Sequence, residues 1–283
     1  MTTPDSERNW FTRPVGRAER FASGVSTRTL RALLEIRAAP EFAILLATLP
    51  WLRTAPEGDG HPVLLMPGFA AGDASLEPLR LFLRSRGYEV ESWGLGRNKG
   101  FNRRFAGVVE QKVRFLHHRH GRTISLIGWS LGGVFAFYAA HSAPECVRMA
   151  ISLGSPLRLD ADRPPPPGVR AMYQALSHPL GPVSHQARSR SRAMRTVPPV
   201  PSTCIYSMSD GVVPPHQATL EGDPASHENI CVPGSHSGLG INSLVMWIVA
   251  DRLAQPEGEW QPFKPEGLVA RALQRSEAAC VDG

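Results

Sequence analysis

A serine set between two glycines, where an apolar segment passes into a helical one, constrains this chain more than any other feature. Residues 123–129 are apolar and typical of a short β-strand, and residues 134–140 are rich in alanine and phenylalanine and typical of a helix. Between them Gly128, Ser130 and Gly132 form the pattern Gly-x-Ser-x-Gly. A strand that turns sharply into a helix through such a serine predicts an α/β domain with the hydroxyl at the edge of its sheet.

The turn has the features of a nucleophile elbow. A serine hydroxyl attacks poorly until a base removes its proton, so it must stand clear of the backbone where a histidine can reach it. A turn this tight strains the backbone of Ser130, at a typical cost of ~1–3 kcal/mol, and leaves no room for side chains at Gly128 and Gly132. An ordinary glycine-rich turn is the alternative, because with 26 glycines in 283 residues the bare pattern arises by chance in roughly one such chain in five. Its placement between strand and helix favours the elbow.

Size and composition favour a single globular enzyme. A chain of 283 residues can build one large core, and 42% hydrophobic with 20% charged residues argues against disorder. The net charge of +6 and the pI near 9.5 suggest a nucleic-acid or anionic-membrane partner. The excess arginine is spread along the whole chain, however, so we expect no nucleic-acid partner.

The cysteines and the N-terminus give an expectation about location. The four cysteines are widely separated and form neither a C-x-x-C pair nor a metal-ligand spacing, so we expect reduced thiols. Cys204 and Cys231 both fall in predicted strands, and a bridge between them stays open. Residues 1–8 are polar and contain acids, unlike a signal peptide, and no apolar run reaches the ~18 residues of a membrane span. We therefore expect a cytoplasmic protein.

Apolar segments alternate with helical segments along most of the chain. Residues 61–66 are almost continuously apolar, which is typical of a strand covered on both faces of a parallel sheet. The alternation predicts a mostly parallel, doubly wound α/β sheet. We expect Ser75 to cap the helix at 76–86. The other expected strands lie at 88–93, 123–129, 147–154, 203–207 and 227–232, and the other expected helices at 102–120, 134–140 and 242–253.

The chain divides into a helical N-terminal extension (1–60), an α/β domain (61–254) and a C-terminal surface tail (255–283). Two apolar helical stretches of the extension end at Pro50, and we expect them to pack on the domain, with contact to a membrane or an acyl chain as the alternative. Residues 155–201 interrupt the alternation at the C-terminal end of a strand, where ligands bind in such sheets, so we interpret them as a cap insertion. The arginines of this cap are either a solvated face or a site that attracts phospholipid or another anion.

Two further motifs suggest a cofactor and are rejected. Residues 94–100 resemble a dinucleotide-binding Gly-x-Gly-x-x-Gly, but the third glycine is one position late and no helix follows directly. His117, His118 and His120 lie at the end of an expected helix, where histidines favour the helix dipole and are usually solvated. We therefore expect no metal and no organic cofactor.

Each of the two strands nearest the C-terminus is followed by a candidate partner for Ser130. Asp210 follows the first of them, and His236 lies in a glycine-bounded loop after the second. Because the carboxyl ends of parallel strands meet at one edge of a sheet, we expect Ser130, Asp210 and His236 to form a catalytic triad. His216 is a weaker alternative base, and His61 precedes its strand, at the wrong end of the sheet.

These motifs together resemble the α/β-hydrolase superfamily, and within it the bacterial lipases and esterases. The resemblance covers about residues 61–254. It implies that the backbone N–H groups of Phe69 and Leu131 form an oxyanion hole, although Pro67 stands where many lipases have a histidine. The segments that carry it are PGF at 67–69, GWSLGG at 128–133, SDGVV at 209–213 and GSH at 234–236.

The expected function is therefore that of a serine hydrolase that cleaves carboxylic esters, acyl or lipid, through a Ser-His-Asp triad and an acyl-enzyme. An acyltransferase or a thioesterase would use the same acyl-enzyme and is the nearest alternative. A non-catalytic binding protein on the same fold is a more distant one. The expected partner is a small-molecule or lipid ester, with peripheral membrane contact open, and the sequence gives neither the physiological substrate nor the oligomeric state.

Overall fold

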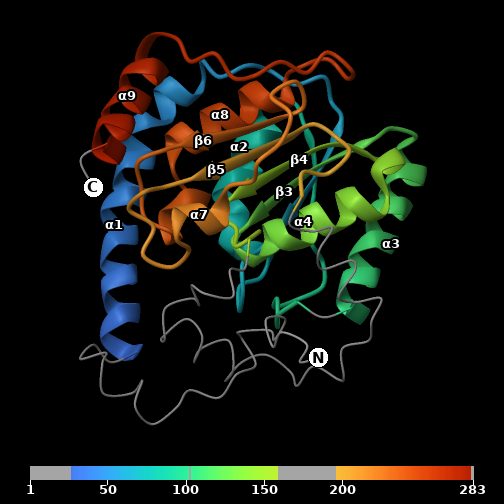
Figure 1. Cartoon of the computed structure of the whole chain (residues 1–283), viewed down its shortest axis with the longest axis horizontal. Coiled ribbons are helices and arrows are strands. Elements are labelled where there is room, and N and C mark those ends of the chain that lie inside the picture. The colour runs from blue at the N-terminus through green and yellow to red at the C-terminus, as the bar shows by residue number, and fades with distance from the viewer. Residues whose placement is uncertain (1–26, 102, 159–195, 282–283) are drawn as a thin grey trace, which may run out of the picture.

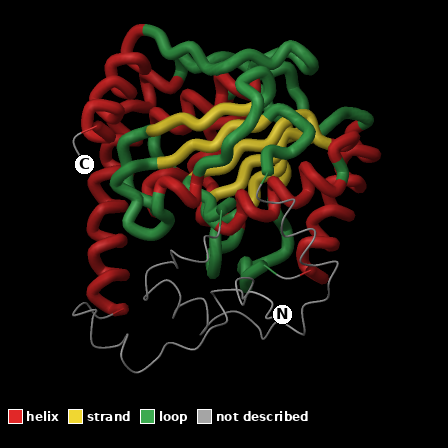
Figure 2. The backbone as a smooth tube through the Cα atoms, in the orientation of Figure 1, coloured by secondary structure: helices red, strands yellow, loops and turns green. Residues whose placement is uncertain are grey.

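The chain folds into a six-stranded parallel sheet with helices on both faces (Figures 1 and 2). The computed structural model describes residues 27–101, 103–158 and 196–281. The strand order across the sheet is β2-β1-β3-β4-β5-β6, which confirms the predicted doubly wound α/β sheet. The strands are β1 (Pro62–Met66), β2 (Glu89–Glu91), β3 (Ile124–Trp129), β4 (Val147–Leu153), β5 (Ser202–Tyr206) and β6 (His227–Cys231).

The helices divide between the two faces of the sheet. Helices α1, α2, α8 and α9 contribute to the core on one face, and α3 and α4 to the core on the other. The α-helices are α1 (Thr27–Leu52), α2 (Glu77–Ser85), α3 (Arg103–His120), α4 (Leu131–Ser142), α7 (Pro215–Ala218), α8 (Ser243–Leu253) and α9 (Gly267–Val281), and the 3-10 turns are η2 (Asp73–Leu76), η3 (Pro144–Cys146) and η4 (Ser237–Gly240).

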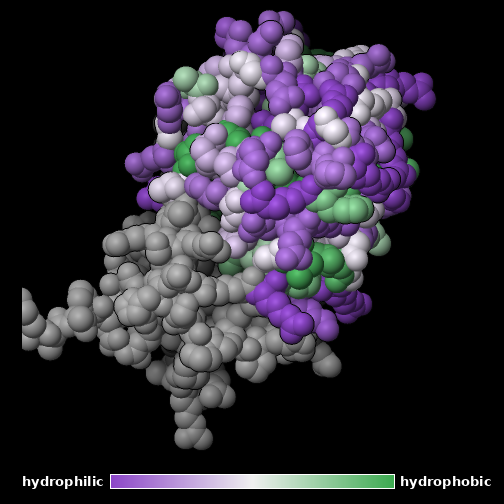
Figure 3. Space-filling model, turned by 90° about the vertical axis from the view of Figure 1, so that its right-hand side faces the viewer, coloured by the Kyte–Doolittle hydropathy of each residue, from purple (hydrophilic) through white to green (hydrophobic). Residues whose placement is uncertain are grey.

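The strands are apolar on both sides because each side meets a different core. Val63 and Leu65 of β1 point to the core shared with α1, α2 and α8, whereas Leu64 and Met66 point to the core shared with α3 and α4. All four side chains are at most 3% exposed. Burying such a side chain contributes ~1.5–3 kcal/mol, so the alternation fixes the register of the strand. Figure 3 shows the side of the molecule on which α3 lies in Figure 1, and most of its described surface is hydrophilic.

The strand order reverses between β1 and β3, and this position determines where a site can form. The chain leaves β1 toward the edge strand β2 and then returns to β3 on the other side of β1. Their register pairs Met66 with Gly128, so both strands end at the same level. Ligands of open α/β sheets bind at the carboxyl ends of strands on either side of such a reversal. The loop after β1 and the serine after β3 therefore face a common crevice.

The N-terminal helix runs further than the sequence suggests. Pro50 was expected to end it, but α1 includes both Pro40 and Pro50 and ends at Leu52. The last turn is held from outside, since Leu52 is buried and the ring of Trp51 stacks on Trp247 of α8 with centroids 6.3 Å apart. Tertiary packing therefore outweighs the hydrogen bond that the proline removes.

Two further boundaries differ from expectation. Ser75 does not cap α2: its hydroxyl donates to the carbonyl of Gly72 inside the preceding turn η2. The segment expected to be a surface tail contains α9, whose Val269 and Leu273 are buried in the core beside α8. Leu268 beside them is 61% exposed, so only one side of α9 packs against the domain.

Parts of the remaining predictions fall outside the described residues. These include residues 1–26 of the N-terminal extension and most of the expected cap, at 159–195. No helix among the described residues is both long and apolar enough to cross a bilayer. Helix α1 buries Leu45 against the domain and exposes apolar side chains on its outer side, namely Phe42, Ile44, Leu46 and Leu49.

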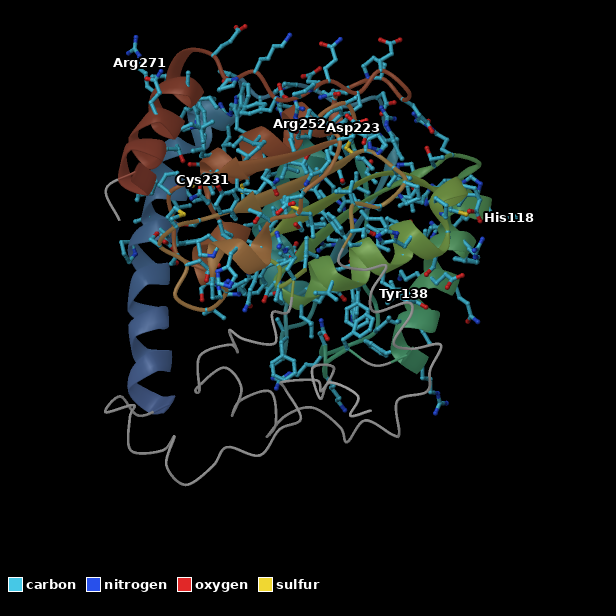
Figure 4. All side chains as sticks on the ribbon, in the orientation of Figure 1. His118, Tyr138, Asp223, Cys231, Arg252 and Arg271 are labelled. Carbon is cyan, nitrogen blue, oxygen red and sulfur yellow. The ribbon has the colours of Figure 1, made fainter. Side chains whose placement is uncertain are left out.

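Cys204 and Cys231 are free thiols, so the bridge left open by the sequence does not form. They lie on neighbouring strands but out of register, because Cys204 is opposite Asn229. Burial raises the pKa of the Cys204 thiol to about 12, which makes it a poor nucleophile. Figure 4 shows Cys231 at the end of β6, on the side of the sheet toward α1, and His118 of α3 on the opposite side.

Candidate active site

The structure brings Ser130, His236 and Asp210 together at the carboxyl edge of the sheet. Ser130 lies between β3 and α4, Asp210 follows β5 and His236 follows β6. His236 Nε2 is 2.9 Å from the Ser130 hydroxyl oxygen, and His236 Nδ1 is 2.7 Å from Asp210 Oδ2. An unbroken chain of hydrogen bonds thus joins three side chains that span 106 positions of the sequence.

The backbone of the elbow has the strained geometry that the glycine pattern predicts. Ser130 has φ 54° and ψ −123°, a backbone conformation that residues other than glycine rarely adopt. A Cβ on Gly128 would lie 2.2 Å from backbone atoms of Gly132 and Gly133. A Cβ on Gly132 would lie 2.0 Å from the carbonyl oxygen of Met66. Only bare backbone fits at both positions, and this close packing holds the serine hydroxyl away from the chain.

Asp210 is fixed as well as paired. Its Oδ1 accepts hydrogen bonds from the backbone N–H groups of Val212 and Val213, each at 2.8 Å. Its Oδ2 faces His236, and the side chain is only 2% exposed. A carboxylate held at both oxygens cannot rotate, so it holds the imidazole in one orientation with the Nδ1 proton toward Asp210.

Gly154, which the sequence analysis did not single out, makes room for the Asp210–His236 pair. It directly follows β4 and has φ +56°. A Cβ there would lie 3.1 Å from Asp210 Oδ2, 3.3 Å from His236 Nδ1 and 2.6 Å from the side chain of Leu239. The only signal in the sequence is a glycine at the end of a predicted strand, which is too common to identify a site.

The loop that carries His236 is anchored from two sides. The indole Nε1 of Trp129, the residue before the serine, donates to the carbonyl of His236 at 3.0 Å. The hydroxyls of Ser207 and Ser209 both donate to the carbonyl of Gly234 at 2.7 Å. The histidine is therefore held by the ends of β3 and β5 as well as by its own strand.

The loop expected to supply one oxyanion-hole donor lies against the serine. A Cβ on Gly68 would be 3.2 Å from the Cβ of Ser130, so the backbone just before Phe69 lies against the serine. Ala70 has φ 61°, a strained value for a residue with a side chain. Leu131 is the first residue of α4, and the first N–H groups of a helix have no acceptor within it.

Asn98 supports this loop in a way that the sequence did not reveal. Its side-chain amide donates to the carbonyl of Pro67 at 2.9 Å, and its backbone exchanges hydrogen bonds with Ala70 and Ala71 at 2.7 and 2.8 Å. The residue is fully buried. It lies in the glycine-rich segment 94–100, and through Asn98 this segment braces the loop after β1.

The other titratable candidates lie elsewhere. Asp210 pairs with His236 rather than with His216, which lies on α7. Among the described residues, Glu89, Glu91 and His120 are a group that could hold a metal ion. They already pair with one another, since His120 contacts Glu91 at 3.0 Å and Glu89 at 3.2 Å. The cluster joins the end of α3 to the edge strand β2 through these contacts.

A second Ser-His-Asp chain lies at the opposite edge of the sheet. His61 Nε2 is 2.8 Å from the Ser125 hydroxyl, and His61 Nδ1 is 2.5 Å from Asp59. Ser125 and His61 are fully buried, and Asp59 also binds the guanidinium of Arg148 at 2.8 Å. Burial lowers the pKa of His61 to about 4, against the hydrogen bond to Asp59, which raises it. Because Ser125 is fully buried, no substrate can reach its hydroxyl. We therefore interpret these three hydrogen-bonded side chains as a structural contact and not as a second active site.

The depressed pKa of His61 makes stability depend on pH. Between about pH 4 and 6.5 the unfolded chain binds a proton at His61 that the folded chain does not, so the free energy of unfolding falls as the pH is lowered. With the pKa of His61 lowered from 6.5 to about 4, we expect a loss of about 2 kcal/mol in the free energy of unfolding between pH 7 and pH 4.5. Urea unfolding at both pH values should show a smaller loss of unfolding free energy in His61→Asn than in the wild type. His118→Asn, at an exposed position, should behave as the wild type does, and equal losses in all three proteins would contradict the assignment.

Comparisons with known proteins agree on the fold. No family model matches the chain, and no curated protein does either. Among solved structures it is similar to Aspergillus fumigatus lipase B, with a TM-score of 0.55 and 18% identity over 80% of this chain. The match spans 61% of that lipase, less than two thirds of its length.

Two further similarities are weaker. A monoacylglycerol lipase of Paleococcus ferrophilus matches with a TM-score of 0.47 and 14% identity over 69% of this chain and 96% of the other. A thioesterase domain from the curacin biosynthetic pathway matches with a TM-score of 0.47 and 15% identity over 71% and 93%. The parallel sheet, its strand order and the similarity to lipase B show that this chain has the α/β-hydrolase fold.

Proposed function

We propose that this protein is a serine hydrolase that cleaves carboxylic esters of acyl or lipid substrates. The observation that supports this most directly is the hydrogen-bonded chain Ser130–His236–Asp210, with its serine in a strained conformation at the start of a helix. Strain of this kind costs ~1–3 kcal/mol and persists where it serves a site. The structural similarity to Aspergillus fumigatus lipase B supports the same chemistry.

The proposed mechanism follows from the order of the hydrogen bonds. His236 Nε2 accepts the proton of Ser130 as the oxygen attacks the ester carbonyl, and Asp210 stabilises the imidazolium that forms. The imidazolium then gives its proton to the leaving alcohol, which leaves an acyl group on Ser130. Water, deprotonated by the same histidine, attacks the acyl-enzyme and releases the acid. No step needs a group from outside the chain other than water.

We assign the oxyanion hole to the backbone N–H groups of Phe69 and Leu131. The close approach of Gly68 to Ser130 and the start of α4 at Leu131 support this assignment. Each such donor is typically worth about 10²–10³ in rate, because it stabilises charge that appears only in the transition state. Asn98 supports this loop through its hydrogen bond to the carbonyl of Pro67.

The proposed function is tested with p-nitrophenyl esters from C2 to C16, with and without a lipid–water interface. We expect hydrolysis with an initial burst, because acylation releases p-nitrophenol before the acyl-enzyme is cleared. The chain-length optimum distinguishes an esterase from a lipase. A complete lack of hydrolysis, together with no covalent labelling by a fluorophosphonate, would refute the proposal.

The nearest alternatives share the acyl-enzyme and differ in what is bound before or after it. An acyltransferase would pass the acyl group to an alcohol or amine in preference to water, and a thioesterase would prefer an acyl thioester to the matched oxygen ester. Adding acceptors to the ester assay, and comparing matched oxygen and sulfur esters, separates these reactions. If most of the acyl group is recovered on the acceptor, the proposed reaction changes from hydrolysis to acyl transfer. The assignment of the triad residues is then unchanged.

A further inference from the structure

Glu41 of the N-terminal helix α1 reaches the loop that carries His236. Its Oε1 accepts the backbone N–H of Ser235 at 2.8 Å, and its Oε2 accepts the hydroxyl of Ser235 at 2.5 Å. The two residues are 194 positions apart in the sequence. One carboxylate therefore binds both polar groups of the residue directly before the histidine.

The same contact closes the turn on both sides of His236. The Ser235 hydroxyl, fully buried, also accepts the backbone N–H of Gly238 at 3.1 Å. A Cβ on Gly238 would lie 1.9 Å from Glu41 Oε2, so the loop lies directly against the carboxylate. Glu41, Ser235 and Gly238 thus form one network that encloses the backbone of the histidine.

Glu41 and Trp129 hold this loop from different elements. Trp129, at the end of β3, binds the carbonyl of His236, and Glu41, from α1, binds the residue before it. Hydrogen bonds to a charged acceptor are roughly twice as strong as neutral ones, and removing the acceptor leaves buried donors unpaired. The imidazole is therefore directed at Ser130 by contacts outside the three side chains of the triad.

We propose that Glu41 is a positioning residue, through which the N-terminal helix sets the geometry of the His236 loop. The inference rests on the proposed hydrolase function and extends it to a segment outside the α/β domain. Glu41 acts through Ser235 and not on the substrate. In this assignment α1 is part of the catalytic unit, because the reach of Nε2 to Ser130 depends on where the helix places its carboxylate.

The test compares Glu41→Ala, Ser235→Ala and the double variant with the wild type. Since a displacement of about 1 Å can cost ~10²-fold in rate, we expect each single variant to lose ~10–100-fold in kcat and in the rate of fluorophosphonate labelling, with KM little changed. The double variant should lose no more than the worse single variant, because both changes break the same contact. Glu41→Gln, which keeps one acceptor oxygen, should lose less than Glu41→Ala.

Two controls separate positioning from general stability. Leu273→Ala removes a buried side chain of α9 from the core on the same face of the sheet, and should lower the melting temperature while the folded protein keeps its kcat. Glu221→Gln removes a negative charge from a side chain that is 93% exposed, and should change neither. Rates are referred to the folded fraction measured by circular dichroism.

The outcomes distinguish this inference from the proposed function. If the wild type is labelled and Glu41→Ala and Ser235→Ala are labelled at the same rate, Glu41 is a structural contact only and the hydrolase proposal stands. If the wild type itself is not labelled, the hydrolase proposal fails first. Should Glu41→Ala not fold, Glu41→Gln takes its place, because its amide offers one acceptor oxygen to the two donors of Ser235.

Discussion

Ser130→Ala is expected to abolish ester hydrolysis and fluorophosphonate labelling while leaving the fold intact. The hydroxyl oxygen is the atom that would attack the ester, and His236 Nε2, 2.9 Å away, would have no proton to accept from alanine. Removing the nucleophile of a triad typically costs ~10⁶ in kcat, so the residual rate should fall to the limit of the assay. Hydrolysis of p-nitrophenyl esters and labelling by the probe measure the two losses, and circular dichroism measures the fold.

Ser125→Ala is the matched control, because the chain offers a second serine bound to a histidine. The Ser125 hydroxyl is hydrogen-bonded to His61 Nε2 at 2.8 Å, and the residue is fully buried. We expect this variant to lose stability, through an unpaired group at His61, and to keep its labelling rate. Labelling that persists in Ser130→Ala and disappears in Ser125→Ala would overturn the choice of nucleophile.

Asp210→Asn is expected to lower kcat by about 10⁴ without unfolding the protein. Asp210 Oδ2 accepts the Nδ1 proton of His236 at 2.7 Å, which leaves Nε2 free to accept the proton of Ser130. An amide can turn its NH₂ toward Nδ1 instead, which would favour the wrong tautomer and remove the charge that stabilises the imidazolium. The drop should appear in kcat more than in KM, since the contact acts in the transition state.

Asp223→Asn controls for the loss of one carboxylate. Asp223 precedes β6, is exposed, and caps a turn through the backbone N–H of Ala225 at 2.9 Å. Figure 4 labels its position. Its substitution should leave kcat within a factor of about two, as expected of a surface position. If Asp210→Asn behaved in the same way, another residue would have to orient His236.

The sequence allowed the sheet and the three candidate catalytic residues to be predicted, because both depend on local signals. A strand covered on both faces is apolar throughout, as residues 62–66 show, and the ends of parallel strands meet at one edge. Ser130 follows β3 directly, and Asp210 and His236 lie in the loops after β5 and β6. Their convergence therefore needed only the order of the strands, and the glycines around Ser130 supplied the geometry.

The contacts that support these residues could not be predicted, since they join distant segments without any pattern in either. Glu41 binds Ser235 across 194 positions, and Asn98 braces Pro67 from a loop that resembles a failed dinucleotide motif. Helix α1 continues past Pro50 because Trp51 stacks against Trp247 of α8. Rules that place helix ends from the local sequence do not include such a tertiary contact. Long-range polar contacts of this kind need coordinates.

The two hydrogen-bonded trios at opposite edges of the sheet bear on how such sites are searched for. A template that compares only distances among serine, histidine and aspartate returns both, since Ser125–His61–Asp59 matches as closely as Ser130–His236–Asp210. They differ in the main chain: Ser125 lies inside β3, whereas Ser130 has φ 54° in the turn that ends it. Adding the torsion angles of the serine to the template would discard the inert trio before any assay is run.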